Sequence, residues 1–162
     1  APAPLELTLV SAASAAAAPA GGDLELGLRL DRGRTRWRLG AAALLRHGLA
    51  GALGTGEVRT LSALGAASIR YAATRWQTTL ELRGGAMRLA GSGFENNQVD
   101  WLPWAEVAGS LSWVGRRVAV GLVASGTPVS HRAVTLDRME ARDIPRFRLG
   151  LTVTIPLWRN NR

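Results

Sequence analysis

The sequence has no cysteine, no lysine and only two histidines among its 162 residues. The absence of cysteine excludes disulfide bonds and thiolate metal sites, and it leaves the redox compartment open. No long uninterrupted apolar run is present either, which excludes a membrane-spanning helix. All 20 basic residues are therefore arginine, and the net charge is +8. These arginines are dispersed rather than clustered into a phosphate track, which argues against nucleic acid as a partner.

The chain begins Ala-Pro-Ala-Pro, without an initiator methionine or a basic-then-apolar leader. We interpret residues 1–4 as a mature N-terminus or as a linker from a longer chain. By its length, the stretch 1–162 is predicted to form a single domain. The two histidines and the scattered loop acids show no metal-ligand spacing, so we expect no metal and no cofactor.

The clearest pattern lies in residues 146–158, where apolar and polar side chains alternate. Side chains on a strand point to opposite faces in turn, so this segment predicts a strand with one apolar face. The apolar face carries Phe147, Leu149, Leu151, Val153, Ile155 and Leu157. The polar face carries Arg146, Arg148, Gly150, Thr152 and Thr154. Soluble sandwiches contain such strands too, so the rest of the chain has to decide the class.

The same alternation recurs in seven earlier segments, of which the Ala-rich first one is the weakest. These predicted strands lie within residues 5–18, 23–31, 36–46, 60–71, 76–86, 105–113 and 117–125. Tight turns at 32–33, 74–75 and 115–116 alternate with longer connections at 19–22, 48–56, 91–100 and 127–145. This order predicts an all-β, eight-stranded antiparallel up-and-down barrel, with the tight turns and both termini at one end.

Aromatic residues fall into two groups along the chain. Five lie close to a tight turn or to the C-terminus, namely Trp37, Tyr71, Trp76, Trp113 and Trp158. Three lie near the long connections, namely Trp101, Trp104 and Phe147. Aromatic rings prefer a membrane interface, where an apolar body meets a polar edge. Two aromatic girdles around a band of Leu, Ala and Val therefore predict a transmembrane β-barrel.

The polar faces of the strands must then point into the barrel. An arginine that faces lipid at mid-depth costs about 2–4 kcal/mol, whereas mixed charges in the interior can pair. The expected interior network consists of Glu25, Arg29, Arg36, Arg38, Arg70, Glu81, Arg83, Glu106, Arg117 and Arg148. A soluble lipocalin-like barrel needs the opposite arrangement, with apolar side chains inside.

In these features the chain resembles the small eight-stranded outer-membrane β-barrels of Gram-negative bacteria, of the outer-membrane protein A and X type. Such proteins carry a C-terminal signal for the barrel-assembly machinery: a polar residue, glycine two positions later, and two hydrophobic residues separated by one. Arg148, Gly150, Val153 and Ile155 match this signal, although four residues follow Trp158 where many members end. The resemblance implies a bacterial outer-membrane location, with periplasmic termini and an extracellular loop at 127–145.

An eight-stranded barrel has an interior just wide enough for side chains, so the predicted network implies a filled lumen. We therefore expect a structural, anchoring or interaction module without a large pore, and a narrow ion or small-solute channel is the alternative. The third possibility is a lipid-modifying enzyme, because some barrels of this type are lipid A hydrolases or acyltransferases. Ser130 beside His131, or His47 with Ser62 or Glu57, would have to serve it. Adjacent side chains on a strand point apart, so we expect no catalytic residue.

The expected partners are the lipid bilayer, lipopolysaccharide, the barrel-assembly machinery during insertion, and a possible protein partner at the loops or an appended domain. Lipopolysaccharide carries phosphates, which arginine binds through its planar fork. The arginines near the long connections are candidates for this contact, namely Arg59, Arg88, Arg132, Arg138, Arg142 and Arg146.

Overall fold

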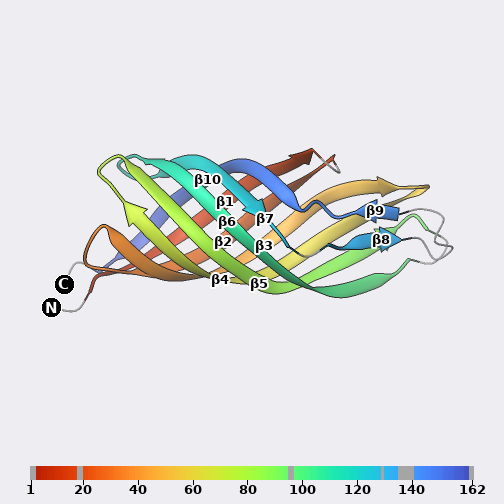
Figure 1. The fold of residues 1–162 in the computed structure, drawn as a ribbon, viewed down its shortest axis with the longest axis horizontal. Coiled ribbons are helices and arrows are strands. Elements are labelled where there is room, and N and C mark those ends of the chain that lie inside the picture. The colour runs from red at the N-terminus through yellow and green to blue at the C-terminus, as the bar shows by residue number, and fades with distance from the viewer. Residues whose placement is uncertain (1–2, 18–19, 95–96, 129, 135–140, 161–162) are drawn as a thin grey trace.

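Eight antiparallel strands close into a barrel, and a separate two-stranded sheet lies at one end of it (Figure 1). The computed structural model describes residues 3–17, 20–94, 97–128, 130–134 and 141–160. The barrel strands are β1 (Leu5–Ala17), β2 (Ala20–Arg32), β3 (Trp37–Leu53), β4 (Gly56–Ala72), β5 (Trp76–Ser92), β6 (Val99–Val114), β7 (Ala119–Gly126) and β10 (Phe147–Arg159). Each strand pairs with its neighbours in the chain, and β10 pairs with both β7 and β1 to close the ring. Among the described residues, no helix is long and apolar enough to cross a membrane.

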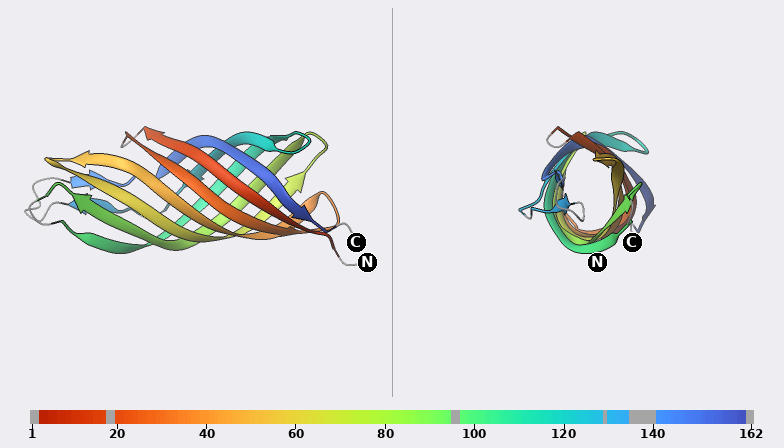
Figure 2. Two further views of the ribbon diagram at one scale, coloured as in Figure 1. Left: turned by 180° about the vertical axis from the view of Figure 1, so that it is seen from behind. Right: turned by 90° about the vertical axis from the view of Figure 1, so that its right-hand side faces the viewer.

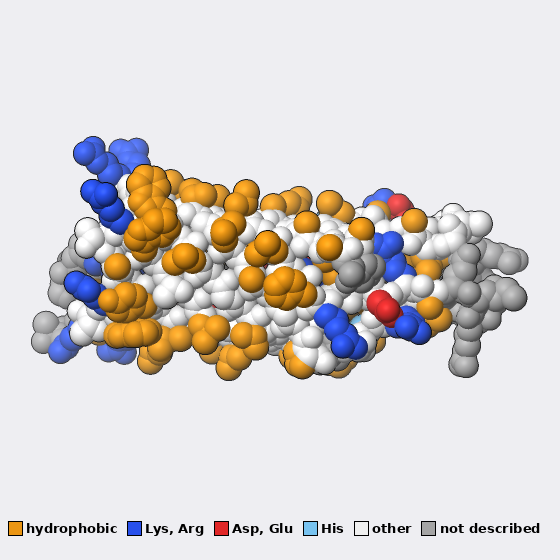
Figure 3. Space-filling model, turned by 45° about the horizontal axis from the view of Figure 1, so that its top comes forward, with side chains coloured by type: hydrophobic (Ala, Val, Ile, Leu, Met, Phe, Trp, Pro, Cys, Tyr) orange, Lys and Arg blue, Asp and Glu red, His pale blue; other side chains and the backbone are white. Residues whose placement is uncertain are grey.

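The two faces of the strands differ in the way that the alternation predicts. On β2, Leu24 and Leu28 are 55% and 47% exposed, whereas Glu25 and Arg29 between them are 8% and 3% exposed. Apolar side chains accordingly cover the outer surface of the barrel wall (Figure 3). A water-soluble barrel has the reverse arrangement, so this exterior is suited to contact with hydrocarbon.

Both termini lie at the same end of the barrel, together with the three tight turns (Figure 2). We call this the terminus end. The turns occupy residues 33–36, 73–75 and 115–118, close to their predicted positions. The N–H of Asn160 donates a hydrogen bond to the carbonyl of Leu5 at 2.9 Å, which joins the end of the chain to its beginning.

The predicted loops at the opposite end, which we call the loop end, are partly wrong. Ala20–Gly22 belong to β2, and most of residues 48–56 continue β3 and begin β4. A register shift between Gly48 and Gly51 lets this Gly- and Ala-rich stretch stay paired, and the positive φ of 57° at Gly54 turns the chain. Small residues give no alternation to read, yet their backbones still pair, so the strands are longer than the pattern suggested.

The predicted loop at 127–145 contains a short hairpin of its own. Strands β8 (Arg132–Val134) and β9 (Ala141–Asp143) pair antiparallel and form the second sheet. From β9 the chain returns to the barrel wall through Ile144, whose side chain is only 7% exposed. The hairpin is therefore attached to the barrel by a buried apolar side chain.

Candidate functional site in the barrel interior

The middle of the barrel interior is occupied by three arginines and three glutamates, which we call the central network. Its members come from β2, β3, β5 and β6, and they are Glu25, Arg29, Arg46, Glu81, Arg83 and Glu106. Arg83 Nη1 lies 2.9 Å from Glu25 Oε2 and 3.0 Å from Glu106 Oε1. Arg46 Nη2 lies 2.7 Å from the same Glu25 oxygen. Every glutamate of the network is thus in contact with two guanidinium groups.

The central network is nearly excluded from solvent and electrically balanced. Its six side chains are at most 6% exposed, and the three positive charges match the three negative ones. Burying charges is costly unless each one is paired and hydrogen-bonded. The shared contacts meet this condition. Removal of one member would leave a buried, unpaired charge.

A second charged group lies nearer the terminus end, and we call it the mouth cluster. It contains Glu6, Asp31, Arg38, Arg70 and Arg159. Glu6 is in contact with Arg38, and its Oε1 lies 2.9 Å from Nη2 of Arg70. Arg159 lies farther off, with Nε at 3.9 Å from Glu6 Oε2. One carboxylate is therefore shared by three guanidinium groups.

An apolar cluster fills the interior toward the loop end. Its buried members are Leu44, Leu64, Met87, Leu89, Trp104 and Ile144. Trp104 joins the cluster to the charges, because its Nε1 donates a hydrogen bond of 3.0 Å to Glu106 Oε2. The guanidinium carbon of Arg148 lies 5.3 Å from the centre of the Trp104 ring, within cation–π range. The interior is thus charged in its middle, and beyond it an apolar cluster lies beside the separate ion pair of Arg148 and Asp23.

The position of Trp104 corrects the prediction that it belongs to an aromatic girdle. Its side chain is 3% exposed and points inward. Trp104, Glu106 and Ala108 are two residues apart on β6, so they share one face of the strand. Because Glu106 was predicted to face inward, the position of Trp104 two residues before it could have revealed that Trp104 also faces inward.

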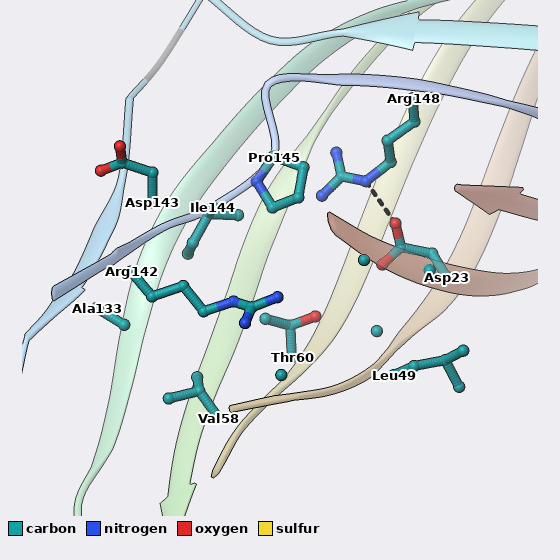
Figure 4. A pocket seen from close by; sticks show the side chains of 14 residues that line it. Asp23, Leu49, Val58, Thr60, Ala133, Arg142, Asp143, Ile144, Pro145 and Arg148 are labelled. Carbon is teal, nitrogen blue, oxygen red and sulfur yellow. Dashed lines mark hydrogen bonds and ion pairs between the residues drawn. The ribbon is translucent and has the colours of Figure 1, made fainter. Parts of the chain in front are cut away.

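Arg142 and Ile144 close the interior at the loop end (Figure 4). The guanidinium of Arg142 donates hydrogen bonds to the carbonyl of Ala20 at 2.5 Å and to that of Ala52 at 3.0 Å. These carbonyls belong to β2 and β3, beyond the point where those two strands pair. A cavity of only about 50 Å³ remains beside Arg142. The Arg142 side chain therefore connects two separated strand ends across the loop end of the barrel.

Eight of the ten predicted network residues lie inside the barrel: Glu25, Arg29, Arg38, Arg70, Glu81, Arg83, Glu106 and Arg148. They form three groups rather than one, because Arg148 pairs with Asp23 apart from the others. Arg36 and Arg117 are exposed in turns, where the alternation of the strand no longer applies. The prediction omitted Glu6, Asp23, Asp31 and Arg46, although each shares a strand face with a residue that it did include or with another inward-facing side chain.

The other predicted girdle residues lie on the outside of the barrel, where Tyr71 is half-buried beside Trp37. Trp37, Trp76, Trp101, Trp113, Phe147 and Trp158 are all more than half exposed. The rings of Trp37 and Tyr71 are in contact, with centroids 4.9 Å apart. A register shift on β10 pairs Leu7 with Trp158 but Thr8 with Pro156. The bulge at this point turns the ring of Trp158 outward.

The residues of the predicted assembly signal all lie on β10. Arg148 points inward, and Ile155 is partly exposed on the outside. At Gly150, a Cβ atom would lie 2.2 Å from the carbonyl oxygen of Ala13 and 2.6 Å from Cα of Ser14. The close approach of β1 therefore requires glycine at this position of the closing strand.

The two histidines were considered above only as what a lipid-modifying enzyme would need. His47 is exposed and faces outward beside Leu61, whereas Ser62 points inward and is 3% exposed. His131 Nε2 lies 2.9 Å from the carbonyl of Pro103, and its ring stacks on Trp104 at 5.7 Å. Within the described ranges, no group of three or more His, Cys, Asp and Glu residues could hold a metal ion.

No protein-family model matches this sequence, and no curated protein matches it. Solved structures do match the fold. Neisserial surface protein A has a TM-score of 0.55 at 9% identity, covering 94% of this chain and 96% of its own. Ail, the attachment invasion locus protein of Yersinia pestis, was solved in complex with the heparin analogue sucrose octasulfate. It has a TM-score of 0.56 at 8% identity, and the match covers 96% of this chain and 100% of Ail. The N-terminal β-barrel domain of Pseudomonas aeruginosa OprF has a TM-score of 0.51 at 9% identity, and the match covers 95% of this chain and 97% of that domain. The chain thus has the fold of the small eight-stranded outer-membrane β-barrels.

Proposed function

We propose that this protein is an outer-membrane barrel that serves as a structural, anchoring or interaction module, with a filled interior and no large pore. One observation supports this most directly. The cavity lined by Glu25, Arg29, Glu81 and Arg83 has a volume of only about 10 Å³. That volume is roughly what a single water needs, which supports a filled interior at the level of the central network.

The surface of the barrel supports the membrane part of this proposal. Leucines and valines cover its outer wall, and six aromatic side chains project outward from it. We infer an outer-membrane location with periplasmic termini, an extracellular loop end, and aromatic girdles at the two interfaces. The motif on β10 would then be read by the barrel-assembly machinery.

The loop end is the proposed site of contact with lipopolysaccharide or with a protein partner. Of the candidate arginines, Arg138 lies outside the described residues. Arg132 and Arg59 are exposed but already paired, with Asp143 and Glu57. Arg142 is committed to the carbonyls of Ala20 and Ala52, which leaves Arg88 and Arg146 as the better candidates for phosphate.

Conductance in planar lipid bilayers tests the filled interior. The detergent-folded protein is first checked by gel mobility with and without boiling, because a folded barrel of this kind shifts on heating. We expect no stepwise conductance above that of the bare bilayer. Steady, large single-channel steps would contradict the proposal.

A narrow channel is the second candidate, and the geometry of Arg83 favours it. This side chain contacts Glu25, Glu81 and Glu106 at once, so it can give up one partner while it keeps another. Such an exchange would open a gap without unpairing a charge. Small, flickering conductance that increases in a Glu25→Gln variant would favour the channel over the sealed module.

A further inference from the structure

The net positive charge of the chain is concentrated at the terminus end. The tight turns and the strand ends that flank them carry nine arginines and two carboxylates among the described residues. The arginines are Arg32, Arg34, Arg36, Arg38, Arg70, Arg75, Arg116, Arg117 and Arg159, and the carboxylates are Glu6 and Asp31. The central network is neutral, so this end carries most of the excess of +8. Figure 3 shows the gathering of arginines beyond the apolar wall.

Within this end, the barrel interior opens into a cavity of about 510 Å³. Its charged lining consists of Glu6, Arg38, Arg70, Arg116, Arg117 and Arg159, five cations and one anion. Arg116 and Arg117 are exposed in the turn between β6 and β7, and the inner wall is formed by the mouth cluster. The volume is typical of a small-molecule site.

The cations of this cavity are incompletely paired. Glu6 is shared by three guanidinium groups, as described above. Arg70 also lies 3.0 Å from Oδ2 of Asp31, outside the lining, so the five cations face only two carboxylates. The side chains of Arg70 and Arg38 are only 3% and 15% exposed, whereas Arg116, Arg117 and Arg159 are exposed at the opening of the cavity. An excess of guanidinium groups around one cavity favours an anion that brings several acceptor oxygens.

We propose that this arginine-lined cavity binds a small multivalent anion of the phosphate class. Several guanidinium forks converge on it from different strands, which suits the several oxygens of a phosphate better than a single carboxylate. Two sources of such a group are available at a membrane surface: a soluble phosphate compound and the headgroup of an anionic phospholipid. This inference goes beyond the anchoring role and does not depend on whether the barrel conducts.

Titration calorimetry with inorganic pyrophosphate tests the proposal on the full chain folded in an uncharged maltoside detergent. We expect saturable binding of one pyrophosphate per barrel. The double variant Arg116→Gln/Arg117→Gln removes two exposed cations of the lining and should weaken binding by about tenfold or more. The matched control Arg34→Gln/Arg75→Gln removes the same charge from two other turns at this end, outside the lining.

The control double variant should bind pyrophosphate within about twofold of the unaltered protein, because long-range attraction is screened by salt. Equal weakening by both double variants would show that only the general charge of this end matters, and it would overturn the site. Absence of saturable binding would overturn it as well. Heat-modifiable gel mobility confirms that each variant is folded.

The lipid source is separated from the soluble one in nanodiscs. If a headgroup is the ligand, discs of phosphatidylglycerol should abolish pyrophosphate binding that discs of phosphatidylcholine retain. If the ligand is soluble, pyrophosphate should bind in both kinds of disc, with a weaker apparent affinity in the anionic lipid. Either result supports the phosphate-class site, and failure to bind in both discs contradicts it.

Discussion

The two ends of the barrel interior differ in almost every physical respect. The terminus end is open, with a cavity of about 510 Å³ whose charged lining is mostly arginine. The loop end is closed by Ile144 and Arg142, has an apolar cluster beneath them, and leaves about 50 Å³. Between the two lies the neutral central network. The barrel therefore keeps its uncompensated charge where water is available, and the sealed end has an apolar cluster beside the balanced pair of Arg148 and Asp23.

The largest effect is expected from Glu106→Gln, which breaks the boundary between the charged and apolar halves. Glu106 accepts hydrogen bonds from Arg46, Arg83 and Trp104. Loss of its charge leaves the buried network with three guanidinium groups and only two carboxylates, which should cost about 3–5 kcal/mol of unfolding free energy. Urea unfolding in lipid vesicles, followed by tryptophan fluorescence, measures this.

The matched control for this change is Glu57→Gln. Glu57 pairs with Arg59 on the outside of the barrel near the loop end, and both side chains are substantially exposed. Exposed pairs contribute about 0–1 kcal/mol. Comparable losses for the two variants would show that the central network is hydrated rather than sealed.

The apolar half is tested next, by Met87→Ala. Met87 is 1% exposed and lies in the cluster with Leu64 and Trp104. Truncation of a packed side chain of this size should cost about 2–5 kcal/mol. The control Leu82→Ala is on the same strand but faces outward at 64% exposure, and it should cost less because it leaves no cavity. A larger loss of stability in the outward control than in Met87→Ala would contradict the tight packing of the apolar cluster.

A smaller effect is expected from Arg142→Gln, which loosens the closed end. The variant loses the guanidinium that bridges Ala20 and Ala52, and such bonds contribute about 1.5–3 kcal/mol when fully formed. Solvent at the loop end reduces the contribution of these hydrogen bonds to stability. Hydrogen–deuterium exchange should speed up in β8 and β9 while the barrel strands keep their protection. Unchanged exchange in the hairpin would mean that Ile144 alone holds it.

The smallest effect is expected at the exposed pair of Arg132 and Asp143. The guanidinium of Arg132 donates a hydrogen bond of 2.6 Å and holds the pKa of Asp143 below its ordinary value. This stabilisation is therefore present above the ordinary pKa of aspartate and is lost as the pH falls through the lower, folded value. Carboxyl NMR titration should show the lowered pKa, and Arg132→Gln should return it toward normal. The barrel unfolding midpoint should not move.

The sequence by itself determined the strands and their faces. The alternation around Leu24, Glu25 and Leu28 is a local property, because successive side chains on any strand point apart. The tight turns at the terminus end were likewise readable from short polar and glycine-containing breaks. The prediction failed where the sequence has no apolar–polar alternation, as in the Gly- and Ala-rich stretch at 48–53, which pairs through its backbone.

Only the tertiary structure decided which side chains meet. Arg46 and Glu106 are 60 residues apart, and they touch because closure of the barrel places β3 and β6 across a narrow interior. The same closure separates charges that look dispersed in the sequence into a neutral middle and a basic terminus end. It also places the inward-facing Trp104 against Arg148, and a bulge turns Trp158 outward. A strand pattern specifies a face for each residue, but its partners depend on the register and tilt of all eight strands together.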